Sequence, residues 1–269
     1  MAGHSTANSG TTVPLCVLVI PAVSEGSKRR LECLFDHVIP VPPITGISAA
    51  NLELIGRPDL HTTLTKLNLW TLDQYERVLY LDADTLVLSN LDHLFSLPDH
   101  IGFAASPDVG FPDCFNSGVM LLKPNKTTYM ELSRLAGEVE SFDGGDQGLL
   151  NIHFGDGTLG HPVKRLLSNQ ESPDPAARAW FRLSFTYNMQ MHKVYRLYVS
   201  AVLRYRSQHK VIHFLGKDKP WNFPDGKVEA PEDTSAYFEF YCDMVSRWWH
   251  VRRQVESNDS KAGGRQIQA

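Results

Sequence analysis

The stretch RVLYLDADTLVL, residues 77–88, is an apolar run that carries two carboxylates, Asp82 and Asp84, side by side. Bulky apolar residues without alternation predict a buried parallel strand, because both faces of such a strand are covered. Acids at its carboxyl end would lie at the edge of an open α/β sheet, where such sheets bind ligands. Residues two apart on a strand point the same way, so both carboxylates are expected to converge on one hard cation and a substrate phosphate.

Two other interpretations of this motif are open. The acids could simply end a strand in a solvated turn. A phosphohydrolase with an aspartyl nucleophile also begins from an apolar strand and an Asp-x-Asp pair, but such enzymes usually carry Gly after the second Asp, near the start of the domain. Here Thr85 follows Asp84 well inside the chain, which makes the phosphohydrolase the weaker alternative.

Six stretches, taken in order, resemble the family-8 glycosyltransferases, and within that family the glycogenin group. They are RPDLHTTLTKLNLW (57–70), LDADTLVLSNLDHLF (81–95), SPDVGFPDCFNSGVMLLKP (106–124), SFDGGDQGLLN (141–151), FTYN (185–188) and VIHFLGKDKPW (211–221). The resemblance covers most of the chain. It implies a single GT-A-type, Rossmann-like nucleotide-sugar transferase domain, α/β in class, with a mostly parallel central sheet flanked by helices.

Composition fits one cytoplasmic enzyme domain. A chain of 269 residues can bury one sizeable core, and its 42% hydrophobic and 21% charged residues are ordinary for a globular protein. A net charge of −4 gives no reason to expect nucleic acid or a membrane as partner. The four cysteines form no C-x-x-C pair and are expected to be reduced thiols. The N-terminus does not resemble a signal peptide.

Periodicity predicts strands alternating with helices, as in a doubly wound α/β fold. We expect a strand at 15–23, helices at 27–38, 63–75 and 127–142, and a further helix from Asp146. The polar segments 1–12 and 257–269 are expected to be disordered, and residues 13–256 to form the glycosyltransferase domain.

His213, in VIHFLG, adds an imidazole nitrogen to the oxygens of Asp82 and Asp84. A lone His on an apolar strand is more often a packed core residue than a ligand. The resemblance nevertheless implies that it binds the metal with the two acids, and a mixed oxygen and nitrogen set suits Mn²⁺.

The sequence Gly216-Lys-Asp-Lys219 follows this histidine. A glycine lets backbone approach phosphate oxygens, and an ammonium offsets the charge on a leaving UDP. The resemblance gives that role to Gly216 and Lys219. The alternative is an ordinary surface turn with solvated lysines.

Short polar groups aimed at hydroxyls would recognise the sugar. The segments 106–118 and 143–148 are rich in Asp, Asn, Ser and Gly, which turn chemistry alone could also explain. By resemblance, the contacts to the UDP-glucose donor come from Arg57, Lys66, Asp82, Ala83, Asp84, Asn116, Ser117, Asp143, Asp146, Gln147, His213, Gly216 and Lys219.

Family-8 enzymes retain the anomeric configuration, either through a covalent intermediate on a carboxylate or by front-face attack within an ion pair. Asp146 is the candidate nearest the anomeric carbon and Gln147 the alternative stabiliser, with Lys66 as a further catalytic residue. The sequence leaves both mechanisms open.

The resemblance also implies self-glucosylation of a tyrosine, followed by extension of a glucan primer in glycogen biosynthesis. Segment 191–206 occupies the matching place. If it is one helix, Tyr198 and Tyr205 lie on its apolar stripe and are expected to be packed, whereas Tyr195 lies at the margin and is the predicted acceptor.

The chain departs from the family at its start, where VPLCVLVIPAV matches the second strand and the nucleotide-binding first strand is apparently missing. Two further hypotheses follow. The chain could be a truncated, weakly active homologue that associates with a full-length partner or with glycogen synthase. It could also use another sugar and acceptor, as a galactinol-synthase-like enzyme does. The aromatic-rich segment 236–252 could cap the core or form a homodimer.

Overall fold

A computed structural model describes residues 2–45, 53, 58–110, 112–155, 180–191, 198–228 and 236–265, with the backbone alone for 58–61 and 258–265. The chain divides into two compact units. Unit 1 comprises Met1–Thr12, Leu81–Leu91 and Phe185–Ala269, and unit 2 comprises Val13–Tyr80 and Asp92–Ser184.

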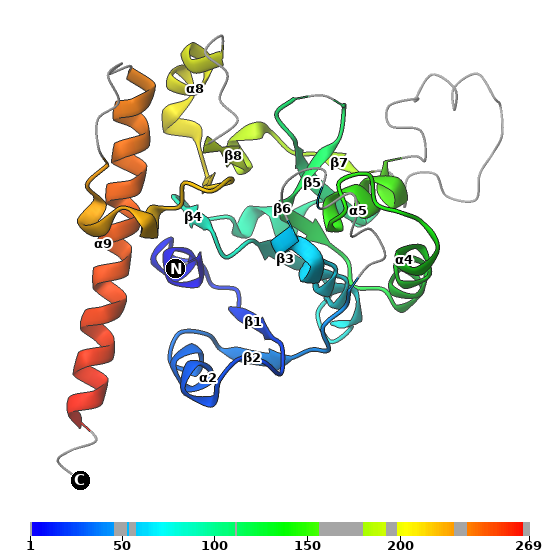
Figure 1. The fold of residues 1–269 in the computed structure, drawn as a ribbon, viewed down its shortest axis with the longest axis horizontal. Helices are drawn as coiled ribbons and strands as arrows, with labels where there is room; N and C mark the ends of the chain where they lie inside the picture. The colour runs from blue at the N-terminus through cyan, green and yellow to red at the C-terminus, as the bar shows by residue number, and fades with distance from the viewer. Residues whose placement is uncertain are drawn as a thin grey trace. The chain divides into compact units, whose positions relative to one another are not determined.

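Unit 2 contains two sheets. The larger has the strand order β3-β6-β5-β7, with β3 at Val78–Leu81, β5 at Phe103–Pro107, β6 at Phe115–Leu122 and β7 at Phe181–Arg182. Strand β5 runs antiparallel to β6 and parallel to β7. Strands β1 (Cys16–Val19) and β2 (His37–Pro40) pair in parallel, and α2 (Glu25–Glu32) contacts β2 (Figure 1). The α/β class is confirmed, and its sheets are mixed.

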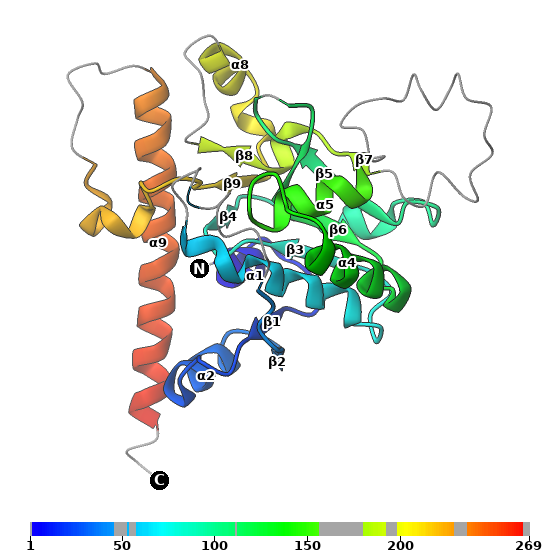
Figure 2. The same ribbon diagram turned by 45° about the vertical axis from the view of Figure 1, so that its right-hand side comes forward.

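Helices cover the larger sheet of unit 2. The 3₁₀ segment η1 (Pro58–Thr71) contacts α4 (Lys126–Glu138), and α5 (Asp146–Phe154) contacts both α4 and β6 (Figure 2). The helix predicted from Asp146 is confirmed, and the one predicted over 127–142 is present but ends at Glu138. The predicted 63–75 helix is instead the 3₁₀ segment η1, which starts earlier. A shorter 3₁₀ segment, η2, spans Asp92–Ser96. The core centres on stacked rings of Trp70, Phe103 and Phe154.

The apolar run at 77–88 forms two short strands instead of the single buried parallel strand that the sequence predicts. Strand β3 ends at Leu81, and β4 (Thr85–Val87) begins after a turn that contains both acids. The turn forms because Thr85 donates its N–H and its hydroxyl to the Asp82 carbonyl, at 3.1 and 2.7 Å. Strand β4 then pairs antiparallel with β9 (Val211–His213). The parallel prediction is therefore wrong for β4.

Unit 1 is built on the three-stranded sheet β4-β9-β8, with β8 at Met189–Gln190 parallel to β9. Its helical segments are η3 (Phe185–Tyr187), α8 (Val199–Arg204), η6 (Arg206–Gln208), η7 (Pro220–Asn222), η8 (Pro224–Gly226) and α9 (Ala236–Arg265). The core joins Leu86, Ile212 and Phe214 to Met244 and Trp248 of α9, so this helix packs on the core, which is one of the two alternatives that the sequence left open. Within the described ranges, no helix combines the length and apolarity needed to cross a bilayer.

Helices occupy parts of both segments that were predicted to be disordered, 1–12 and 257–269. Residues Ala2–Asn8 form α1, in which Ser5 and Thr6 are buried. The Ser5 hydroxyl accepts the Val87 N–H of β4 at 3.1 Å, on the edge of β4 that does not face β9. At the other end, α9 continues past Ser257 to Arg265. Polar composition predicted disorder in both places, but a helix pairs its own backbone groups, and α1 also buries Ser5 and Thr6.

We expect Ser5→Ala to lower the free energy of unfolding by about 1–3 kcal/mol, because it leaves the buried Val87 N–H without an acceptor. Urea unfolding followed by circular dichroism measures this change. Ser133→Ala is the matched control, since the Ser133 hydroxyl is buried in α4 without a hydrogen-bond partner among the described residues. Equal destabilisation by both variants would contradict this role for Ser5.

Candidate active site

Two clusters of polar side chains, one in each unit, contain most of the predicted site residues. The first, in unit 1, begins at the turn between β3 and β4, where Asp82 and Asp84 are partly buried. Because Thr85 is paired with His213 in the β4–β9 ladder, the histidine lies opposite the end of this turn. The Phe214 N–H also donates to the Asp84 carbonyl at 3.1 Å, which extends the ladder to the acid.

The two acids and His213 converge on one place. His213 Nε2 lies 3.2 Å from Asp84 Oδ1 and 3.7 Å from Asp82 Oδ2, and one ligand atom from each residue lies within 4.8 Å of the others. The predicted convergence is therefore confirmed, but through a turn and a neighbouring strand. The sequence argument from two residues on one strand gave the right result for the wrong geometric reason.

The chemistry of this triad fits a divalent cation. His213 is 1% exposed, and its Nδ1 is 2.9 Å from the Asn188 Oδ1 acceptor, so Nδ1 carries the proton. The Nε2 lone pair then faces two carboxylates, and Nε2 makes no hydrogen bond with a described residue. A lone pair and two anionic oxygens repel one another unless a cation lies among them. Orientation of a ligand histidine by a second polar group is also usual at metal sites.

Lys219 completes the first cluster. Its ammonium group contacts the Asp84 carboxylate and donates to the Phe214 carbonyl at 2.7 Å. Burial raises the pKa of Asp84, but the Lys219 ammonium beside the carboxylate opposes this effect, and that pKa lies well below its usual range. Gly216 has a φ of +83°, which side-chain-bearing residues rarely adopt, so glycine suits this turn. Ala83, between the acids, is exposed.

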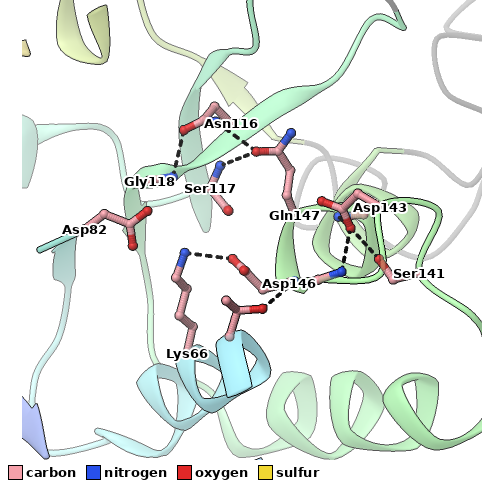
Figure 3. A network of polar contacts seen from close by, with 12 residues as sticks. Lys66, Asp82, Asn116, Ser117, Gly118, Ser141, Asp143, Asp146 and Gln147 are labelled. Carbon is pink, nitrogen blue, oxygen red and sulfur yellow. Dashed lines mark hydrogen bonds and ion pairs between the residues drawn. The ribbon is translucent and has the colours of Figure 1, made fainter. Parts of the chain in front are cut away.

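The second cluster lies in unit 2, around the first turn of α5. Asp146 and Lys66 form an ion pair with 2.9 Å between Oδ2 and Nζ, and both side chains are largely buried (Figure 3). The Asp146 N–H donates to Thr63 Oγ1 at 3.3 Å, and Lys66 Nζ lies 5.2 Å from the centre of the Tyr80 ring. These contacts from η1 and β3 hold a carboxylate and an ammonium beside the start of α5.

Asp143 organises the loop that enters α5. Its Oδ1 accepts from Ser141 Oγ and from the backbone N–H groups of Gly145 and Gly148, at 2.7, 3.0 and 2.9 Å (Figure 3). The residue before α5 is Gly145, which offers no side-chain cap, so Asp143 supplies the acceptor that a capping residue normally gives. Direct contact of Asp143 with a donor sugar stays a prediction.

Asn116, Ser117 and Gln147 also meet. Gln147 Oε1 accepts from Asn116 Nδ2 at 2.9 Å and from the Ser117 N–H at 3.3 Å. The Asp108 carboxylate joins them through hydrogen bonds from both amides. The resemblance did not mark Asp108 as a donor contact. The only local signal in the sequence was its place in the Asp- and Asn-rich turn 106–118. In the structure, the Asp108 N–H donates to the Cys114 carbonyl at 2.8 Å across this turn.

Other predicted residues have different outcomes. Arg57 and Tyr195 lie outside the described residues. Tyr198 and Tyr205, predicted to be packed, are 57% and 41% exposed, which corrects that prediction. The stripe assumed one helix over 191–206, but the described helix α8 begins at Val199, so Tyr198 precedes it and Tyr205 follows it.

The sequence matches glycosyl transferase family 8 over residues 13–224. The match covers most of the chain, and the protein therefore belongs to this family of glycosyltransferases. Its curated relatives include glycogenins: the protein is 39% identical over 253 residues to glycogenin-1 of Mus musculus and 37% identical over 260 residues to glycogenin of Neurospora crassa. It resembles the glycogenin type that its sequence motifs indicated.

This chain is shorter than those relatives. The alignment covers 92% of this chain and 68% of the Mus musculus protein, and 96% of this chain and 33% of the Neurospora crassa protein. A further relative, glycogenin-1 of Caenorhabditis elegans, is 42% identical over 259 residues, which make up 96% of this chain and 54% of that protein.

Solved glycosyltransferases share the fold. The galactosyltransferase LgtC, crystallised with donor and acceptor sugar analogues, aligns with a TM-score of 0.52 and 16% identity over 91% of this chain and 89% of that one. The glycosyltransferase GlyE of Streptococcus pneumoniae aligns with a TM-score of 0.52 and 19% identity over 94% and 60%. The predicted GT-A-type fold is thereby confirmed.

We expect Asp84→Asn to weaken divalent-cation binding by about tenfold or more, because it removes an anionic ligand facing His213. Isothermal titration with Mn²⁺ measures the change. Asp73→Asn, at an exposed position before β3, is the control for the loss of one carboxylate. Unchanged Mn²⁺ affinity in a folded Asp84→Asn protein would rule out the proposed cation site.

We expect Gly148→Ala to lower the free energy of unfolding by about 1–3 kcal/mol, since an added Cβ would clash with Ser141 Oγ and lie 2.5 Å from Asp143 Oδ1. Urea denaturation again gives the value. Gly137→Ala in α4 is the matched control, because its Cβ meets no atom within 4 Å. Destabilisation of the control to the same extent would show that close packing at Gly148 is not the cause.

Proposed function

We propose that this chain transfers glucose from UDP-glucose to a tyrosine hydroxyl and then to the growing glucan primer, with Mn²⁺ as cofactor and with retention of the anomeric configuration. The observation that carries the proposal is the Asp82, Asp84 and His213 triad with Lys219 beside it, in a family-8 chain whose curated relatives include glycogenins.

The unit 1 cluster is assigned to the metal and the diphosphate. Two carboxylates and one imidazole suit Mn²⁺ better than Mg²⁺ or Ca²⁺, which prefer oxygen ligands alone. When bound, the cation would neutralise charge on the diphosphate. The Lys219 ammonium supplies a second positive charge as the bond between the sugar C1 and the phosphate oxygen breaks and UDP leaves with the electron pair.

The unit 2 cluster is assigned to the glucose. Lys66 holds the Asp146 carboxylate in one position through the 2.9 Å ion pair. Asp146 would then stabilise positive charge at C1, or attack C1 to form a covalent intermediate, and both routes retain configuration. Gln147 is less suited to this role, because its Oε1 already accepts two hydrogen bonds.

Tyr195 remains the proposed acceptor, and Tyr198 becomes a second candidate. The Tyr198 side chain is 57% exposed, and an acceptor hydroxyl must reach solvent at least in part. The hydroxyl oxygen forms the new bond to C1, and its proton passes to the oxygen of the departing diphosphate. Association with glycogen synthase, a homodimer and a cytoplasmic location stay predictions.

Intact-mass spectrometry of the purified chain with UDP-glucose and Mn²⁺ tests the function. We expect successive hexose additions to the native chain and none to Asp84→Asn, which lacks a proposed metal ligand. Peptide mapping would locate the first hexose, and Tyr195→Phe should abolish its addition.

Tyr198→Phe is the matched variant. If Tyr198→Phe abolishes the hexose addition and Tyr195→Phe does not, the acceptor is Tyr198 and the assignment to Tyr195 is wrong. A folded native chain that gains no hexose would contradict self-glucosylation. Absence of UDP-glucose hydrolysis in the same sample would contradict the use of this donor altogether.

A further inference from the structure

The amide of Gln147 is held in one orientation. Gln147 lies in the first turn of α5, and its Oε1 accepts from Asn116 Nδ2 and from the Ser117 N–H of β6 (Figure 3). A backbone N–H can only donate, so the atom facing Ser117 must be the amide oxygen. The same argument fixes Asn116, whose Oδ1 accepts the Gly118 N–H at 3.0 Å. Both NH₂ groups must therefore find acceptors elsewhere.

Asp108 supplies that acceptor with a single oxygen. Its Oδ2 accepts from Gln147 Nε2 at 3.0 Å and from Asn116 Nδ2 at 3.2 Å. Asn116 Nδ2 thus donates to two acceptors, Asp108 and Gln147. Gln147 Nε2 donates to Asp108 alone among the described residues, which leaves its second N–H for a ligand. The side chain of Gln147 is only partly buried, so this hydrogen can be reached.

We propose that Asp108 is a positioning residue that makes Gln147 present an N–H donor, and not its carbonyl oxygen, to an oxygen of the bound hexose. The ligand group is a sugar hydroxyl or ring oxygen, which accept hydrogen bonds. This inference rests on the proposed glucosyl transfer and refines its sugar contacts. Asp108 itself touches no reacting atom in this account and acts through Gln147.

The shared oxygen distinguishes positioning from a role of the negative charge. In Asp108→Asn, the amide oxygen can take the place of Oδ2 and accept both hydrogen bonds, although more weakly than a carboxylate. In Asp108→Leu, a side chain of similar shape offers no acceptor. A residue acting as a nucleophile or as a charge would instead lose its function in both variants.

The kinetic test compares the kcat and KM of UDP-glucose hydrolysis in these variants with those of the native chain. We expect Asp108→Asn to keep kcat within about fivefold, and Asp108→Leu to lose about 10- to 100-fold in kcat, as one hydrogen bond to the transition state would give. Asp108→Ala serves if the leucine variant does not fold. Glu140→Gln, an exposed acid before the Asp143 loop, controls for charge loss.

A spectroscopic readout tests the inference without activity. The side-chain NH₂ signals of Gln147 and Asn116 in ¹⁵N NMR, assigned by Gln147→Leu and Asn116→Leu, should stay near their native positions in Asp108→Asn. They should shift or broaden in Asp108→Leu. A purely structural role would change thermal stability in both variants without this ordering.

The outcomes separate the two proposals. Equal loss of kcat in Asp108→Asn and Asp108→Leu would assign Asp108 a charge-based role, and equal retention would remove any role; each overturns the inference. If the native chain neither hydrolyses nor transfers from UDP-glucose, the proposed function fails. The NH₂ signals would still show whether Asp108 fixes the Gln147 amide.

Discussion

The pairing of β4 with β9 is the constraint on which the cation site depends. It sets Thr85 opposite His213 and ties the Asp84 carbonyl to the Phe214 N–H. Two carboxylates and the lone pair of a buried imidazole are thereby held together, an arrangement that repels itself unless positive charge is present. Lys219 supplies part of that charge, and a divalent cation would supply the rest. The pairing thus offers two carboxylate oxygens and one imidazole nitrogen to a single cation.

The unit 2 cluster depends on how α5 begins. Gly145 gives no capping side chain. Asp143, two residues earlier in the chain, accepts the backbone N–H groups of Gly145 and Gly148 instead. This frees Asp146 and Gln147, in the first turn, for contacts with Lys66 and Asn116. A glycine is required at position 148 because the Cβ of any other residue would clash with the Asp143 carboxylate. Loop geometry and candidate catalytic groups are therefore linked through one carboxylate.

The edge of β4 shows a different use of a polar side chain. A free strand edge offers unpaired N–H and carbonyl groups that favour association with other chains. The α1 helix covers this edge, and Ser5 accepts the Val87 N–H in place of a neighbouring strand. Asn8 reaches Gln254 of α9 at 2.8 Å, so α1 is also tied to the long helix.

The sequence by itself determined the class of the fold, the family and the identity of most residues in both clusters. These follow from local facts, such as an apolar run ending in Asp82 and Asp84, or a glycine-rich loop before Gln147. Three predictions that inferred geometry from a local sequence pattern were wrong. The 77–88 run is broken by a turn, Tyr198 is exposed, and polar residues 2–8 form a helix.

Only tertiary structure decided which polar atoms meet. His213 faces the acids because two strands distant in sequence pair in one register. Asp108 orients Gln147 because a turn after β5 approaches the first turn of α5. Hydrogen bonds act over about 3 Å, whereas sequence patterns report only the side of an element on which a residue lies. The chemistry of this site could therefore be read from the sequence as a set of residue types, and its geometry could not.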